Sequence, residues 1–181
     1  MTIGSLFGRR SQPDPVHDLY VVITHQSRLP DFYLRLDVPD TVDGRFDMIT
    51  LHAFLVLHRL KAEGEAAAPF AQAFFDLMFA DMDRNLREMG AGDMGVGRRV
   101  KTMVTAFYGR VAAYEKGLDE DGASLAESLH RNLYRGAEIP EKSIAAMVGY
   151  VEREATSLSA MSFDALAAGK VSFGPPPEAG R

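Results

Sequence analysis

Two long amphipathic stretches, joined by a glycine-rich run, are the feature of this sequence that most restricts its fold. In residues 70–89, apolar side chains recur three or four residues apart at Phe74, Phe75, Met78, Met82, Leu86 and Met89. In residues 98–118, the same spacing connects Val100, Met103, Val104, Phe107, Val111, Tyr114 and Leu118. This spacing places side chains on one face of an α-helix. Each stretch is therefore predicted to be a helix that buries its apolar face against the rest of the chain.

Helical signals also cover most of the chain outside this pair. Asp14 and Pro15 supply a cap and a first-turn proline, so they predict the start of a helix that runs to about Gln26. Residues 45–61 are apolar on almost every side, which predicts a helix in the centre of the domain that ends at Gly64. Capping residues and apolar spacing predict further helices at 124–136 and 140–158, and a short turn at 162–169 capped by Ser162.

Residues 30–39 are the exception, because Phe32, Leu34 and Leu36 alternate with polar residues as in a short strand or an extended surface clip. The whole chain is nevertheless predicted to be all-α, a single compact domain of about six or seven helices. We expect residues 1–12 to form a flexible segment with weak membrane contact, residues 13–168 to form the helical domain, and residues 169–181 to form a disordered, proline-rich tail.

The composition excludes several kinds of protein. The chain has no cysteine, so disulfides, thiolate metal sites and cysteine nucleophiles are absent. Its net charge of −5 argues against broad nucleic-acid binding, and no DNA partner is expected. The longest apolar run, residues 66–80, is too short to span a bilayer and contains Gln72 and Asp76. We therefore expect a soluble protein without a secretory signal.

The glycine run matches the spacing of a dinucleotide-binding loop at Gly90, Gly92, Gly95 and Gly97. That loop needs a strand before it, which aims the backbone N–H groups at the pyrophosphate. A helix precedes the run here, so the glycines are better explained as the stop of one helix and the start of the next. An enzyme that binds a phosphate-bearing ligand at 90–97 remains the alternative.

A basic cluster follows the glycine run. Arg98, Arg99 and Lys101 fall in the first or second turn of the predicted helix, where the helix dipole disfavours positive charge. Helix stability therefore does not explain them. The cluster is suited to an anionic group such as a carboxylate of a partner, a lipid head group or RNA phosphate. The alternative is a set of solvated charges beside Asp93.

Two features of the paired helices predict how they pack. Met78, Met82 and Met89 lie on one stripe, which is typical of core methionines, although such side chains also suit a surface that accepts varied apolar partners. Gly109, inside the second helix, costs about 1 kcal/mol relative to alanine. We therefore expect another backbone to approach closely at Gly109.

Catalytic and metal-binding patterns are missing from the sequence. His52 and His58 are six residues apart on one predicted helix, roughly 240° around its axis, so they cannot share an ion. There is no HExxH motif and no GxSxG elbow, and no enzyme activity, cofactor or small-molecule substrate is expected. Direct haem binding through His52, His58 or a methionine remains an alternative.

Three segments together resemble the ubiquinol–cytochrome c chaperone family, whose members are assembly factors of the cytochrome bc1 complex. They are GRFDMITLHAFLVLHRLK, FFDLMFADMDRNLREMGAGDMGVGRRVKTMVTAFYGRVAAYEKGL and SLHRNLY. The resemblance covers roughly residues 15–150, and its most specific part is DMDRNLREMGAGD followed by AFYGRVAAYEKGL. The lack of cysteine, the acidic character and the absence of a targeting sequence resemble a bacterial member.

The resemblance implies an all-helical, non-enzymatic chaperone that attends newly made cytochrome b during membrane insertion and haem acquisition. It implies a cytoplasmic protein, peripheral at the cytoplasmic face of the inner membrane, with that membrane surface or the ribosome as further partners. A helical interaction protein with an unrelated partner is the alternative. Together with the basic cluster, the candidate partner-binding residues are Asp81, Arg84, Arg87, Asp93, Arg98, Arg99, Lys101, Tyr108, Arg110 and Tyr114.

Overall fold

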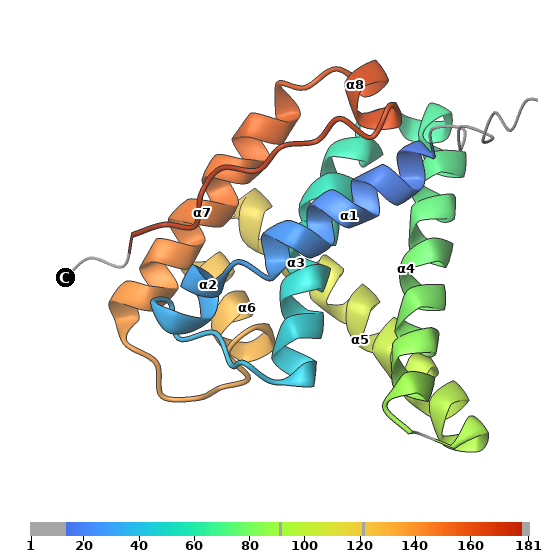
Figure 1. The fold of residues 1–181 in the computed structure, drawn as a ribbon. Coiled ribbons are helices and arrows are strands. Elements are labelled where there is room, and N and C mark those ends of the chain that lie inside the picture. The colour runs from blue at the N-terminus through green and yellow to red at the C-terminus, as the bar shows by residue number, and fades with distance from the viewer. Residues whose placement is uncertain (1–13, 91, 121, 179–181) are drawn as a thin grey trace, which may run out of the picture.

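The computed structural model describes residues 14–90, 92–120 and 122–178, with the side chains of 93, 94 and 122 excepted. Every regular element in these ranges is a helix, so the predicted all-α fold is confirmed (Figure 1). The elements are α1 (Pro15–Ser27), α2 (Pro30–Leu34), α3 (Val42–Lys61), the 3-10 turn η1 (Gly64–Ala66), α4 (Ala68–Glu88), α5 (Asp93–Glu120), α6 (Gly122–Asn132), α7 (Glu141–Ser159) and α8 (Phe163–Ala167). The predicted membrane contact of residues 1–12 lies outside the described residues.

Helix α3 lies in the centre of the domain, as its sequence predicts. It packs against α1, α4, α5 and α7, and most of its residues from Phe46 to Val56 are almost fully buried. Figure 1 shows α1 crossing in front of α3, with α7 on one side and α4 on the other. Contact on nearly every side explains why this helix lacks a polar face.

The prediction of an extended segment at residues 30–39 is wrong for its first half. Pro30 and Asp31 occupy the first turn of α2, where a fixed φ and an acidic side chain both favour a helix. Phe32 and Leu36 are fully buried, whereas Leu34 between them is 80% exposed. The alternation of apolar residues therefore did not mark one face of a strand.

Two expectations about glycines also need correction. Gly109 has no neighbouring atom within 4 Å of an added Cβ, so no backbone approaches it. The close approach lies at Gly117, where a Cβ would be 2.7 Å from the Cα of Leu125 in the crossing of α5 and α6. The glycine connection is also shorter than predicted, because α5 already begins at Asp93 and includes Gly95 and Gly97.

The prediction of a disordered tail from residue 169 is wrong for residues 169–178. This segment runs from α8 back along α7 (Figure 1). Val171 is buried, and the Phe173 ring meets the His52 ring edge to face at 5.0 Å. The Gly174 N–H donates to Glu154 at 2.9 Å, and the Gly174 carbonyl accepts from Gln26 at 2.7 Å. The tail is poor in apolar residues, but these few contacts hold it on an existing surface.

A buried hydrogen-bond chain ties this tail to three helices. His52 Nδ1 lies 2.9 Å from the Met48 carbonyl, which can only accept, so Nδ1 carries the proton. Tyr150 then donates its hydroxyl proton to His52 Nε2 at 2.8 Å and accepts from Gln26 at 3.0 Å. Burial lowers the pKa of His52 to about 4, so the ring is neutral at physiological pH.

Asp47 of α3 is a fully buried acid held by two arginines. Its carboxylate lies 2.8 Å from Arg110 of α5 and 2.8 Å from Arg135, which follows α6. Burial raises the pKa of Asp47 to about 6, and the two arginines oppose that shift. The group is therefore ionised at neutral pH and links α3 to two other parts of the chain.

We predict that Asp47→Asn lowers the free energy of unfolding by about 3 kcal/mol, because it leaves the largely buried Arg110 guanidinium without its counter-ion. Urea denaturation followed by circular dichroism measures the change. Asp40→Asn is the matched control, since Asp40 forms an exposed pair with Arg45 and its loss should barely move the midpoint. Equal midpoints for both variants would show that the Asp47 network contributes little.

We predict that wild-type protein loses stability relative to His52→Gln as the pH falls from 7.5. The folded pKa of about 4 lies below the unfolded value, so neutral His52 stabilises the fold above about pH 6.5 and this contribution is lost toward pH 4. At about pH 5 the free energy of unfolding of wild type, relative to that of His52→Gln, should be about 2 kcal/mol lower than at pH 7.5. Asp47 titrates in both proteins, so its contribution cancels when their free energies of unfolding are subtracted. A constant difference in urea unfolding at the two pH values would contradict this assignment.

Candidate functional site

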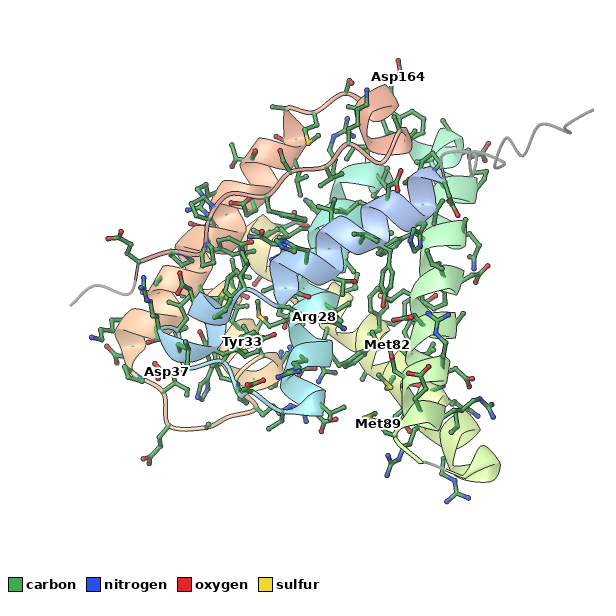
Figure 2. All side chains as sticks on the ribbon, viewed as in Figure 1. Arg28, Tyr33, Asp37, Met82, Met89 and Asp164 are labelled. Atoms are coloured by element: carbon green, nitrogen blue, oxygen red, sulfur yellow. The ribbon has the colours of Figure 1, made fainter. Side chains whose placement is uncertain are left out.

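A groove opens between the end of α1, the first turns of α3 and the second half of α4. Its volume is about 310 Å³. In Figure 2, Met82 and Met89 lie on the α4 side and Arg28 lies across from them at the end of α1. The apolar lining consists of Val42, Phe46, Ile49, Met82, Leu86, Met89 and Met103. The methionine stripe of α4 is thus divided: Met78 is fully buried, Met82 is 7% exposed at the floor of the groove, and Met89 is exposed at its edge.

The exposed apolar side chains of the protein gather around this groove. Two further hollows share residues with it, and Arg28 lines all three. We call the groove and these two hollows the Arg28 face. Among the large apolar side chains that the structure describes as exposed, four belong to this face and Tyr108 does not; the four are Val21, Leu34, Val42 and Met89. A concentration of exposed apolar surface marks a binding surface more often than scattered residues do.

The groove has walls of opposite charge. Arg28 and Arg45 lie on the side of α1 and α3, whereas Asp81 and Glu88 lie on α4. Arg45 is paired with Asp40 at 2.7 Å. Arg28 is exposed and forms no ion pair or side-chain hydrogen bond within residues 14–90, 92–120 and 122–178. It is the unpaired cation of the groove.

Asp81 is the predicted site residue that lies in the groove. Its carboxylate accepts hydrogen bonds from the Tyr20 hydroxyl at 2.8 Å and from Asn85 at 2.9 Å, and it also pairs with Arg84. Burial alone would raise the pKa of Asp81, but these bonds outweigh it and keep the pKa below its usual value. Asp81 is therefore ionised and fixed in place on the α4 wall.

The other predicted residues do not form one site. Arg84 and Arg87 are exposed on α4 and pair within that helix, Arg87 with Asp83 at 2.6 Å. Arg110 is 14% exposed and pairs with Asp47, and Tyr114 is fully buried in the core. The positions of these two residues are architectural. The side chain of Asp93 lies outside the described residues.

Tyr108 lies on the outer side of the paired helices. Its side chain is 58% exposed, and its ring packs against Phe75 at 5.5 Å and Phe107 at 5.8 Å. These contacts fix the ring and leave its edge open to solvent. Tyr108 therefore belongs to a surface separate from the Arg28 face.

The basic cluster begins later in its helix than the sequence predicts. Because α5 starts at Asp93, Arg98 falls in the second turn, beyond the free N–H groups of the helix end. Arg98, Arg99 and Lys101 are exposed, and none forms an ion pair with a residue of the described part of the chain. Arg98 and Lys101 line a shallow hollow on the outside of α5.

The described residues offer histidine, aspartate and glutamate side chains as donors for a metal ion. They contain no group of three or more histidine, aspartate or glutamate side chains that could hold an ion. His52 is fully buried with both ring nitrogens bonded, so it is not available to haem. His58 lies 3.8 Å from Glu115. None of the described helices is both long and apolar enough to cross a bilayer.

Sequence reasoning missed most of the Arg28 face. Arg28, Val21 and Leu34 were not predicted to be functional, because no motif contains them and their helices meet only in the folded chain. One signal was present: Val42 and Met89 are apolar residues at or near the ends of predicted helices, where neighbours cover a side chain less completely. Such positions are candidates for exposure, although they do not identify the partner.

Known proteins match this chain over most of its length. The family model described as ubiquinol-cytochrome C chaperone matches residues 34–173. Ubiquinol-cytochrome c reductase complex assembly factor 1 from Homo sapiens is 28% identical over 87% of this chain and 53% of its own length. Protein CBP3, mitochondrial, from Saccharomyces cerevisiae is 28% identical over 80% of this chain and 44% of its own. The chain thus spans about half the length of these relatives.

A solved structure agrees with the sequence comparisons. The crystal structure of the Cbp3 homolog from Brucella abortus is 41% identical, with a TM-score of 0.79 over 88% of each chain. The residues that the family model matches include the central helix α3, the paired helices α4 and α5, and α7. This chain belongs to the ubiquinol–cytochrome c chaperone family.

Proposed function

We propose that this protein is a bacterial assembly chaperone for the cytochrome bc1 complex that binds newly made cytochrome b during insertion and haem acquisition. The family supports an assembly role, because the human and mouse relatives are named as assembly factors of ubiquinol-cytochrome c reductase. The observation that supports binding as the mode of action is the gathering of exposed apolar side chains on the Arg28 face. The protein acts by binding a client, with no reaction of its own.

The Arg28 face has the properties that an apolar client requires. When a client covers these apolar side chains, binding is favoured by roughly 25 cal/mol for every Å² of apolar surface removed from water. Met82, Met89 and Met103 are flexible thioethers, so the surface can adapt to segments of different shape. A nascent membrane protein presents several such segments before it is inserted.

The basic cluster on α5 serves a second contact in this proposal. Arg98, Arg99 and Lys101 are exposed cations without partners in the described chain, and they suit an anionic surface such as the inner membrane or the ribosome. Such contact would keep the protein at the cytoplasmic face of the membrane, where cytochrome b is inserted. Asp81, Arg84, Arg87 and Tyr108 are the remaining exposed or partly exposed candidates for partner contact.

We predict that Val42→Asp combined with Met89→Asp lowers cytochrome b and intact bc1 complex in membranes to the level of a strain lacking the protein, with transcript unchanged. Both side chains are more than half exposed, so the fold should survive while two charges oppose burial of an apolar client. Immunoblotting and native gels measure the two levels. Ala123→Asp combined with Ser157→Asp adds the same charge at exposed positions of α6 and α7 and should preserve both levels.

Two results would contradict this prediction. Normal levels in the strain lacking the protein would remove the link to the bc1 complex. Suppose instead that the Val42→Asp, Met89→Asp protein has wild-type abundance and unfolding midpoint. Normal levels of cytochrome b and bc1 complex in that strain would show that the client does not bind at the Arg28 face.

We also predict that replacing Arg98, Arg99 and Lys101 together with glutamate lowers bc1 levels and shifts the protein from the membrane fraction to the soluble fraction. The change reverses the charge of an exposed surface and leaves its helix intact. Fractionation at low and high salt measures the shift. A folded triple variant that supports normal bc1 levels would deny the basic cluster any role.

A further inference from the structure

The groove has the form of a helix bundle that lacks one member. On α3, Val42, Phe46 and Ile49 are spaced four and three residues apart, and they line one side. On α4, Met82, Leu86 and Met89 repeat the same spacing along the other side. Only Val42 and Met89 of these six are exposed, and the other four are 4–7% exposed and form the floor of the groove. A third helix can therefore pack its apolar stripe over this floor, between Val42 on one side and Met89 on the other.

The charges beside these stripes complement a helix with two different flanks. Arg28 lies at the α1 side without a carboxylate partner in the described chain, and Glu88 is exposed on the α4 side without a cationic partner there. Asp81 adds a fixed negative charge to the α4 side. A segment with an acidic flank toward Arg28 and a basic flank toward α4 satisfies both walls at once.

We propose that the groove binds one amphipathic helical segment of the client, with a carboxylate paired to Arg28 and a cation facing Asp81 and Glu88. This inference rests on the proposed function for the identity of the client, but the chemistry of the groove alone defines the segment. Because the two walls differ in charge, they also fix the direction of the bound helix. Reversing its direction would place each flank against the wall of its own charge.

The same charges argue against a phospholipid as the occupant. An acyl chain would fit the apolar lining, and Arg28 would suit a phosphate. The head group would then lie beside Asp81 and Glu88, and a like charge there disfavours an anion. A peptide helix avoids this repulsion, because it carries both signs of charge on opposite flanks.

Three fluorescent peptides of about 18 residues, roughly five helical turns, test the inference with the purified full-length protein. All share one stripe of leucine and methionine. The first carries glutamate on one flank and lysine on the other, the second carries glutamate on both flanks, and the third carries lysine on both. In fluorescence anisotropy, the mixed peptide should bind about threefold to fivefold more tightly than either of the others, as expected for partly exposed charge pairs.

Exchange of wall charges should change the order of preference. Arg28→Glu makes both walls acidic, so the lysine peptide should bind most tightly. Glu88→Lys leaves only the bonded Asp81 negative on its wall, so the glutamate peptide should gain most. Arg131→Glu, which makes the same charge change as Arg28→Glu at an exposed position of α6, is the control and should preserve the order. A reversal cannot arise from partial unfolding, which would weaken all three peptides.

The results separate this inference from the proposed function. An unchanged order of peptide affinity in both wall variants would overturn the inference. So would displacement of the mixed peptide by vesicles of anionic phospholipid, if the Val42→Asp, Met89→Asp protein does not bind those vesicles. The proposed function would stand if that double variant still lowered cytochrome b. The expected reversal with normal cytochrome b in the double variant would support a helix-binding groove and overturn cytochrome b as its client.

Discussion

The burial of α3 is the constraint on which the rest of the structure depends. A helix in contact with neighbours on nearly every side needs partners for the charged and ring groups that it carries into the core. Asp47 finds them in Arg110 and Arg135, and His52 finds them in Met48 and Tyr150. These partners come from distant parts of the chain, so the polar groups of α3 fix how α5, α7 and the segment after α6 are placed around it.

The groove lies at the N-terminal end of α3, where the burial of this helix ends. Asp47 and His52 are covered by neighbours, but Val42, five residues before Asp47, is 59% exposed. The first turn of α3 therefore leaves the core between α1 and α4 and carries Val42 to the surface, while Phe46 and Ile49 stay buried below it. Gly44 allows this, because a Cβ there would lie 1.9 Å from the Pro39 carbonyl oxygen. The close contact holds the preceding loop, and with it Asp40 and Arg45, at the rim of the groove.

The sequence predicted those parts of the fold that depend on local periodicity and capping. The Asp14 cap, the central helix, the paired helices and the Ser162 cap were all found in this way. Prediction from the sequence failed where contacts with distant residues determine the local structure. Residues 169–178 are ordered by Gln26, His52 and Glu154, none of which is near them in the sequence. Leu34 shows the same limit, since only the packing of its neighbours reveals that it is exposed.

The candidate site was less predictable than the fold for a related physical reason. A basic cluster such as Arg98, Arg99 and Lys101 is visible in one stretch of sequence, because its members lie on one helix. The Arg28 face is assembled from the ends of several helices, and each of its apolar residues alone is ordinary. Its character appears only when Val21, Leu34, Val42 and Met89 are found around one unpaired arginine.

The two surfaces can act at the same time, because α5 presents them on different sides. Met103 of α5 lines the groove, whereas Arg98 and Lys101 lie roughly 140° and 200° away around the helix axis. A segment bound in the groove would therefore not cover the basic cluster. A protein that holds an apolar client with one surface and an anionic support with another needs this separation, since one surface must release the client while the other stays bound.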